Sequence, residues 1–252
     1  MLYNNTEYPK RFNNICNDIL DGRNIREGYA RSWGLRYGNL REQINEDTDF
    51  KECFMLMKNI GIVDISRIQN IFLLVKFFLP DLIDNRASSI IEFGSYKGGS
   101  AIFIASLVRR LDLPIKVFGL DTFEGMPAVG IEDLHSKGGF IDTDISEVNK
   151  YKDELGLDNL SFVKGLFEDT TIDVLKNTDP VCIAHIDCDI KSSVSYSYNI
   201  VKKYMMHGGY FIFDDATEAS CLGATAVVES EVIRRDGRNS EQIYPHFVFR
   251  NY

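Results

Sequence analysis

The sequence predicts an α/β protein built on an open, doubly wound and mostly parallel β-sheet with helices on both faces. After residue 85, five short apolar runs alternate with stretches in which apolar residues recur at helical spacing. Strands buried on both faces form continuous apolar runs, and right-handed crossovers place helices between consecutive parallel strands. The chain of 252 residues is long enough for one such domain with an extension.

The elements follow from this alternation. Residues 1–85 are predicted to form an N-terminal helical extension or lid that packs on a core of residues 86–252. In the extension, helices are expected at 50–60 and 65–79, with Pro80 ending the second. In the core, strands are predicted at 88–94, 115–121, 160–165, 181–187 and 208–215. Helices are predicted at 98–111, 146–155, 171–177, 193–206 and 223–235, and residues 242–251 are expected to add further strand.

Composition excludes several classes of protein. The 37 acidic and 28 basic residues give a net charge of −9 with no basic run, which argues against nucleic-acid binding. The longest apolar run, 71–79, is too short to span a bilayer, and the first residues lack the apolar core of a signal peptide. The 5 cysteines are scattered without a CxxC pair, which favours a reducing, cytoplasmic compartment over a disulfide scaffold or zinc ribbon.

Acidic residues stand at the ends of four of the five core strands. They are Glu92, Asp121, Asp187 and the adjacent pair Asp214 and Asp215. Ligands of open α/β sheets bind at the carboxyl ends of the strands. Any single acid there could be a helix cap, but the repetition predicts a binding site.

The turn after the first core strand, EFGSYKGGS (92–100), predicts a nucleotide-type ligand. Its glycines permit a tight turn and a close approach to the first amides of the following helix. The spacing is neither GxGxxG nor that of a P-loop. Asp121, at the end of the second core strand, could accept hydrogen bonds from both ribose hydroxyls. Turn and acid together leave open an adenosine-containing methyl donor or a nicotinamide cofactor.

The remaining acids favour the methyl donor. Asp187, Asp214 and Asp215 come from adjacent strands, and three oxygen ligands without a Cys or His cluster suit Mg²⁺ or Mn²⁺. Hydride transfer has no general need of such a metal. Methyl transfer to a hydroxyl does, because the metal lowers the pKa of the hydroxyl and orients it.

Five motifs in register resemble the macrocin O-methyltransferase family. They are EFGSYKGGSA, LDTFEGMP, KGLFEDT, HIDCDIKSS and GGYFIFDD followed by GATAVV, over roughly residues 88–235. The resemblance implies the Rossmann-like class I methyltransferase fold, with a seven-stranded sheet of order 3-2-1-4-5-7-6 whose strand seven is antiparallel. It also implies S-adenosylmethionine as methyl donor, a divalent metal, and a sugar hydroxyl as acceptor, on a nucleotide-linked sugar or a glycoside of a natural-product or polysaccharide (for example capsular) pathway.

The resemblance also assigns site residues. It implies that the methionine side of the cofactor meets Glu92, Gly94 and Gly98, that the ribose meets Asp121, and that the adenine meets Gly165, Leu166 and Phe167. Five further residues are expected to bind the cofactor: Ser95, Tyr96, Ser100, Thr122 and Phe123. The resemblance implies that Asp187, Asp214 and Asp215 hold the metal, with Asp187 also near the cofactor. The sequence departs from the family's pattern at Lys191 and Ser192, where an aromatic residue and an acid are usual, and this puts substrate contacts in doubt.

The catalytic base is expected to be Asp187 or His135. His135 lies in the long loop 122–145, which is expected to be a lid or binding loop. The segment 31–41, which holds Trp33 among arginines, is a second candidate to close over the ligands. His185 and His207 are interpreted as structural, and Asp189 as a capping residue that could shape the metal site.

Two other readings stay open at this point. An NAD-dependent oxidoreductase is the enzyme alternative, and an interaction protein with a relic cofactor fold is the non-enzyme alternative. The sequence does not decide whether the chain acts as a monomer, a homodimer or a higher homo-oligomer. Its partner is expected to be a small-molecule, nucleotide-linked sugar, with neither nucleic acid nor membrane.

Overall fold

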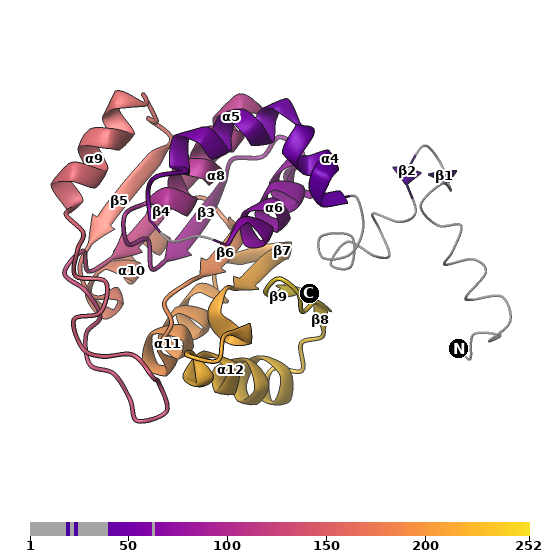
Figure 1. Cartoon of the computed structure of the whole chain (residues 1–252). Coiled ribbons are helices and arrows are strands. Elements are labelled where there is room, and N and C mark those ends of the chain that lie inside the picture. The colour runs from indigo at the N-terminus through magenta and orange to yellow at the C-terminus, as the bar shows by residue number, and fades with distance from the viewer. Residues whose placement is uncertain (1–18, 21–22, 25–39, 62–63) are drawn as a thin grey trace, which may run out of the picture.

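The computed structural model describes residues 19–20, 23–24, 40–61 and 64–252, and it centres on one seven-stranded sheet (Figure 1). The strand order is β5-β4-β3-β6-β7-β9-β8, and β9 is antiparallel to both of its neighbours. The strands are β3 (Ser88–Phe93), β4 (Ile115–Asp121), β5 (Leu160–Lys164), β6 (Val181–Ile186), β7 (Met205–Phe213), β8 (Ser240–Gln242) and β9 (Phe247–Arg250). This confirms the predicted class I methyltransferase fold, including the antiparallel strand. A separate two-stranded antiparallel sheet consists of β1 (Ile19–Leu20) and β2 (Arg23–Asn24).

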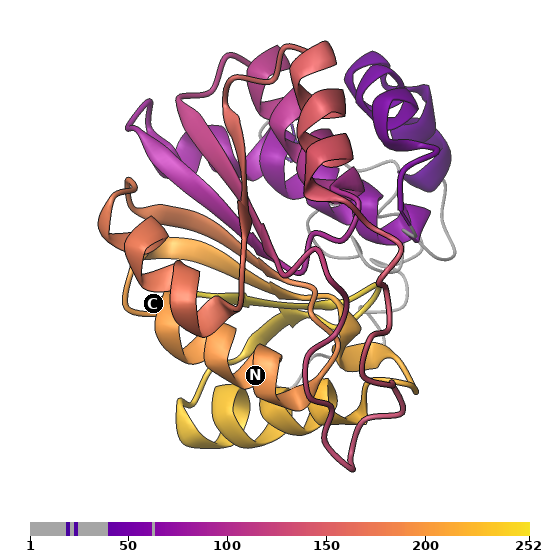
Figure 2. The ribbon, with the colours of Figure 1, turned by 90° about the vertical axis from the view of Figure 1, so that its left-hand side faces the viewer.

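Helices cover both faces of the sheet (Figure 2). One layer contains α4 (Leu40–Glu46), α5 (Thr48–Met57), α6 (Ile65–Leu73), α7 (Leu79–Ile83), α8 (Gly99–Arg110) and α9 (Ile145–Glu154). The other contains α10 (Phe167–Lys176), α11 (Lys191–Val201), α12 (Leu222–Val227) and the π-helical segment Val228–Arg235 that continues α12. The core helices lie within a few residues of their predicted positions, as expected from crossovers between parallel strands.

Pro80 does not end the N-terminal helical stretch as the sequence predicted. A π-helical segment, Leu74–Phe78, follows α6, and Pro80 then lies in the first turn of α7. A proline is tolerated there because the first amides of a helix have no intrahelical acceptor. The wider π-helical turn accommodates Pro80, which has no backbone N–H to donate. The chain therefore continues as helix to Ile83.

The N-terminal helices share a hydrophobic core with the sheet layer. The ring of Phe50 in α5 lies 5.3 Å from that of Phe72 in α6 and 5.8 Å from that of Phe103 in α8. The side chains of Asp47 and Asp64 accept hydrogen bonds from the first amides of α5 and α6, which fixes where these helices begin. Helix α6 is thereby packed beside α8, close to the strand ends that form the site.

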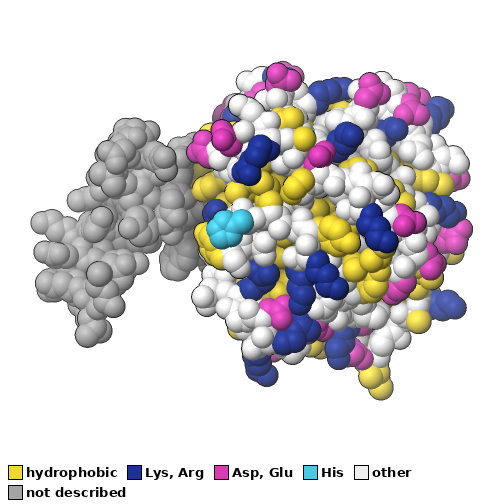
Figure 3. Space-filling model, turned by 180° about the vertical axis from the view of Figure 1, so that it is seen from behind, with side chains coloured by type: hydrophobic (Ala, Val, Ile, Leu, Met, Phe, Trp, Pro, Cys, Tyr) yellow, Lys and Arg dark blue, Asp and Glu magenta, His cyan; other side chains and the backbone are white. Residues whose placement is uncertain are grey.

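The surface opposite to the view of Figure 1 mixes Lys and Arg with Asp, Glu and hydrophobic side chains (Figure 3). None of the helices in the described ranges has the length and apolar character needed to cross a bilayer.

Candidate active site

The turn between β3 and α8 brings the backbone of Gly94 close to the backbone of Asp187. Gly94 has a φ of +92°, and a Cβ there would lie 1.8 Å from the carbonyl oxygen of Asp187. Gly98 has a φ of +82°, and its Cβ would lie 2.7 Å from the ring of Phe162. Only glycine fits both positions without displacing these neighbours. The turn therefore lies against the end of β6 at Gly94 and against a side chain of β5 at Gly98.

Asp121 is fixed by this same turn. Its carboxylate accepts hydrogen bonds from the backbone N–H of Tyr96 at 2.8 Å and of Phe123 at 2.7 Å. The hydroxyl of Thr122 also donates to it at 3.4 Å, and because a carboxylate has about four acceptor positions, it keeps capacity for a ligand. The acid is thus held rigidly at the edge of a cavity with capacity to bind hydroxyl groups.

One cavity of about 540 Å³ opens at the carboxyl ends of the strands. Eight of the predicted cofactor residues line it: Gly94, Tyr96, Ser100, Asp121, Thr122, Leu166, Phe167 and Asp187. His135, Asp214 and Asp215 line the same cavity. Five predicted cofactor residues do not: Glu92, Ser95, Gly98, Phe123 and Gly165. The structure thus places the turn, the ribose acid and the predicted metal acids around a single space.

A buried network of histidines and acids supports the cavity floor. His185 Nδ1 lies 3.1 Å from Glu92 Oε1, and its Nε2 lies 3.3 Å from Asp214 Oδ1. His246 Nδ1 lies 2.9 Å from the same Asp214 oxygen. The other oxygen of Asp214 accepts a hydrogen bond of 2.5 Å from the guanidinium of Arg67 in α6. Asp214 is therefore held by three side chains from three separate elements.

These contacts set the charges of the network. Burial opposes ionisation of Asp214, but hydrogen bonds from His185 and His246 outweigh it and hold the pKa of Asp214 well below its ordinary value. Burial likewise opposes the charged form of His185, while the hydrogen bonds to Asp214 and Glu92 raise its pKa well above the ordinary value. Burial lowers the pKa of His246. The network therefore contains an ionised Asp214 beside a protonated His185 and a neutral His246.

Asp187 and Asp215 have the opposite character. Burial, followed by the charges of Asp214 and Asp215, raises the pKa of Asp187 well above its ordinary value. Burial and the charges of Asp189 and Asp214 do the same to the pKa of Asp215. A bound cation reverses such crowding. The chemistry of this donor set therefore fits a hard divalent cation.

The geometry of that donor set differs in part from the predicted one. Asp187 and Asp214 each offer an oxygen within 4.8 Å of the other and of a ring nitrogen of His185. Asp215 is outside this group, and its Oδ2 accepts a hydrogen bond of 2.8 Å from the backbone N–H of Asp189. Two of the three predicted metal acids are thus brought together, with Asp215 next to them.

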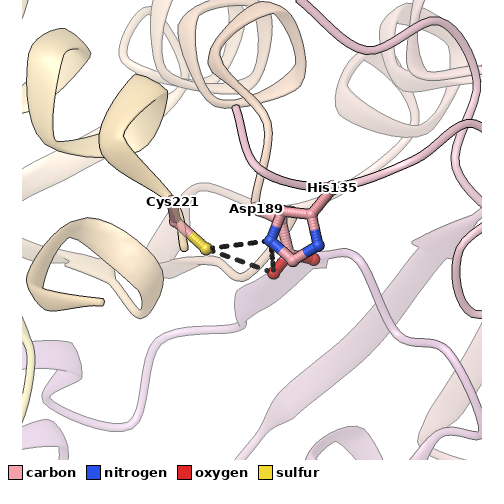
Figure 4. A group of neighbouring side chains, drawn as sticks. All are labelled: His135, Asp189 and Cys221. Carbon is pink, nitrogen blue, oxygen red and sulfur yellow. Dashed lines mark hydrogen bonds and ion pairs between the residues drawn. The ribbon is translucent and has the colours of Figure 1, made fainter. Parts of the chain in front are cut away.

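A second group of side chains lines the same cavity (Figure 4). His135 Nε2 lies 3.3 Å from Cys221 Sγ and 3.5 Å from Asp189 Oδ1. Cys221 Sγ lies 3.5 Å from the same Asp189 oxygen. The residues come from the long loop, the turn after β6 and the start of α12. His135 thus faces Asp189 and Cys221.

Asp133 anchors the long loop that carries His135. Its carboxylate accepts hydrogen bonds of 3.1 Å from the backbone N–H of Gly223 in α12 and of Lys191 in α11. Lys191 also forms a 2.8 Å ion pair with Glu132 of the loop. Lys191, the departure noted in the sequence, therefore holds the loop. The other proposed closing segment, 31–41, lies outside the described residues except for its last two.

Sequence reasoning missed Arg67, His246 and Asp133, and it interpreted His185 as structural only. His185 lies beside Glu92 in the β3–β6 register, two residues before Asp187, so period-two alternation could have placed it with the acids. His246 precedes β9, which pairs with β7 just before Asp214, but that pairing was not foreseen in detail. Exposed His207, in contrast, contacts the ring of Tyr252.

Comparisons with known proteins identify the family and the fold of the chain. The profile of the family described as macrocin-O-methyltransferase (TylF) matches residues 62–232, more than half of the chain. A methyltransferase of Streptomyces olivaceus, 8-demethyl-8-(2,3-dimethoxy-alpha-L-rhamnosyl)-tetracenomycin-C 4'-O-methyltransferase, is 27% identical over 174 residues. That match covers 65% of this chain and 65% of the relative, so the chain spans less than two thirds of the relative's length.

Solved structures show the same fold. The O-methyltransferase NovP superposes with a TM-score of 0.64 at 22% identity, over 75% of this chain and 81% of NovP. The calicheamicin methyltransferase CalS11 superposes with a TM-score of 0.57 at 18% identity, over 84% of this chain and 96% of CalS11. Of the two cofactors that the turn and Asp121 left open, the family match supports S-adenosylmethionine. The chain belongs to the macrocin O-methyltransferase family.

Proposed function

We propose that the protein transfers the methyl group of S-adenosylmethionine to a sugar hydroxyl, with the help of a divalent cation. One observation carries this proposal: a single cavity joins the glycine turn and Asp121 to the crowded acids Asp187, Asp214 and Asp215. The donor part and the acid part of the cavity are therefore close enough for a methyl group to pass between their ligands.

The donor would occupy the part of the cavity along β3 and β4. Asp121, fixed by the amides of Tyr96 and Phe123, would accept hydrogen bonds from both ribose hydroxyls. Leu166 and Phe167, at the start of α10, would flank the adenine, and the ring of Phe167 is held edge-on by Phe93 at 5.3 Å. Gly94 keeps this part of the cavity free of side-chain atoms beside Asp187.

The cation would be Mg²⁺ or Mn²⁺, held by Asp187, Asp214 and Asp215. When bound, it would lower the pKa of the acceptor hydroxyl and orient it. Arg67 and the two histidines keep Asp214 ionised and fixed, so that its carboxylate needs no reorganisation when ligands arrive. Asp189 holds the carboxylate of Asp215 through its backbone N–H.

The proton of the acceptor hydroxyl would pass to Asp187 or to His135. Asp187 lines the cavity beside the proposed cation, so its carboxylate would lie next to a hydroxyl bound there and could take its proton. His135 Nε2 reaches the cavity from the long loop, where it could hold the sugar or take the proton. Because the sulfonium donor is already activated, positioning supplies most of the remaining rate enhancement.

The cavity favours a neutral glycoside over a nucleotide-linked sugar as acceptor. Among the described residues that line it, eight are acidic: Asp64, Asp121, Glu168, Asp187, Asp189, Asp214, Asp215 and Glu218. Arg67 is the single Lys or Arg of this described lining, and it is paired with Asp214 and Glu218. A diphosphate would be repelled there. The Streptomyces olivaceus relative, named as acting on a rhamnosyl group of tetracenomycin C, supports a glycoside.

The test is a methyl-transfer assay with Mg²⁺ and an acceptor panel, read by mass spectrometry as the gain of one methyl group. Aryl rhamnosides should be methylated, and nucleoside diphosphate sugars should react more slowly. Asp187→Asn should lose activity by at least about 100-fold while binding S-adenosylhomocysteine as the parent does. Asp169→Asn, an exposed acid of α10, is the matched control and should keep full activity. No transfer to any sugar in the panel by a protein that binds S-adenosylhomocysteine would contradict the acceptor assignment.

A further inference from the structure

We propose that His135, Asp189 and Cys221 form a second metal site, for a zinc-class cation, on the wall of the same cavity. This site shares no ligand with the proposed magnesium site. The three side chains come from segments far apart in the sequence, the long loop, the turn after β6 and the residue before α12. Their donor atoms are one nitrogen, one oxygen and one sulfur (Figure 4).

The distances between these atoms match the edges of a tetrahedron around zinc. Bond lengths of about 2.3 Å for Zn–S and about 2.0–2.2 Å for Zn–N and Zn–O give edges of about 3.3–3.6 Å. The observed N–S, N–O and S–O distances are 3.3, 3.5 and 3.5 Å. The three atoms thus form a nearly equilateral face that one ion can cap. Because all three residues line the cavity, the fourth position would face it.

The ligand atoms of this site select a different kind of cation from that of the proposed magnesium site. Thiolate and imidazole are poor ligands for Mg²⁺ and good ligands for Zn²⁺ or Co²⁺, whereas the acids around Asp187 suit a hard cation. Outer partners hold the ligands in place, as they do in metal sites generally. The N–H of Asp189 bonds Asp215, the hydroxyl of Ser220 lies 3.5 Å from Cys221 Sγ, and Asp133 anchors the loop of His135.

One consequence rests on the proposed function. With a cation on its Nε2, His135 could neither accept a proton nor hold the sugar, and the acceptor part of the cavity would be narrowed. Zinc should therefore inhibit methyl transfer without displacing S-adenosylhomocysteine. The binding test below does not depend on activity, so it can fail or succeed independently of the methyltransferase assignment.

The experiment is a Co²⁺ titration of the full chain in saturating Mg²⁺, followed by absorption spectroscopy. We expect one tight Co²⁺ per chain, with the intense visible bands of tetrahedral cobalt and a near-ultraviolet thiolate-to-cobalt band, both abolished when Zn²⁺ is added. Cys221→Ser should lose the thiolate band and bind at least about tenfold more weakly. Cys188→Ser, which alters another buried cysteine lining the cavity, is the matched control and should keep both.

His135→Gln provides a second variant that leaves the buried thiol in place. It should also weaken Co²⁺ by at least about tenfold, and circular dichroism with S-adenosylhomocysteine binding checks the fold of each variant. Absence of tight Co²⁺ binding in the parent would overturn the site. A thiolate band that persists in Cys221→Ser, or disappears in Cys188→Ser, would overturn it equally.

Discussion

The guanidinium of Arg67 lies 2.5 Å from the carboxylate of Asp214, so a helix of the N-terminal region reaches the acids at the end of β7. Both side chains are largely buried, with 13% and 7% of their surfaces exposed. A buried acid without its partner is costly, so this pair couples the packing of α6 to the charge of the site.

Arg67→Met should therefore destabilise the protein in EDTA. Loss of one partner of a buried ion pair costs about 3 kcal/mol in the free energy of unfolding. Mg²⁺ should stabilise the variant more than it stabilises the parent, because it replaces the missing positive charge. Urea denaturation with and without Mg²⁺ measures both effects. Arg234→Met, on the exposed C-terminal part of the last helix, is the control, and a parent-like stability of Arg67→Met would refute the coupling.

Asp121→Ala should weaken binding of S-adenosylhomocysteine by about 1.5–3 kcal/mol, the usual scale for lost hydrogen bonds to a charged group. The variant also frees the amides of Tyr96 and Phe123, so Asp121→Asn, which keeps one acceptor oxygen, should lose less. Calorimetric titration compares both with Asp158→Ala, an exposed acid away from the cavity. Unchanged affinity of Asp121→Ala would remove Asp121 from the ribose site.

Asp133→Ala should raise the KM for the acceptor by about fivefold, which corresponds to the usual contribution of a helix cap, about 1 kcal/mol. The reason is that Asp133 fixes the loop of His135 to the first amides of α11 and α12. Asp144→Ala removes a similar cap from α9 and should leave this KM unchanged. Steady-state kinetics measures the acceptor KM of both variants. Equal KM values for Asp133→Ala and Asp144→Ala would show that the loop does not position the acceptor.

Much of this site follows from local patterns, and the part that does not follow depends on contacts between distant elements. Apolar runs and crossovers place Glu92, Asp121, Asp187 and Asp214 at one sheet edge, because parallel strands end together. The structure confirms the sheet order, including the antiparallel β9. The alternation of side chains along β6 also places His185 on the same face as Asp187. This period-two spacing could have predicted that His185 belongs to the site.

Arg67 and Asp133 could not be found in this way. Arg67 reaches Asp214 across 147 residues, and nothing in the pattern of α6 marks it as different from a surface arginine. Asp133 lies in a long loop without periodicity, and its role appears only once α11 and α12 are placed beside it.

Asp236 provides a pH test of stability away from the site. Its hydrogen bond with Arg235, joined by others from Lys202 and Tyr198, holds the pKa of Asp236 below the ordinary value of 3.8. A lowered carboxyl pKa contributes stability that is complete above the unfolded-state value and is lost as the pH falls through the lower pKa of the folded protein. Asp236→Asn should thus be less stable than the parent by about 1 kcal/mol near pH 6, and this gap should begin to shrink only as the pH falls below 3.8. Urea denaturation at several pH values measures the difference, and a constant gap would contradict the assignment.

Metal dependence of methyl transfer tests the central claim most directly. The protein should be stripped with EDTA, with residual metal measured, and then assayed with S-adenosylmethionine and the best glycoside acceptor. We expect no activity without metal, and full recovery with Mg²⁺ or Mn²⁺, because Asp187, Asp214 and Asp215 crowd together without a cation. Asp215→Asn should not recover with either metal although it still binds S-adenosylhomocysteine. Full activity of the parent after exhaustive metal removal would contradict the account.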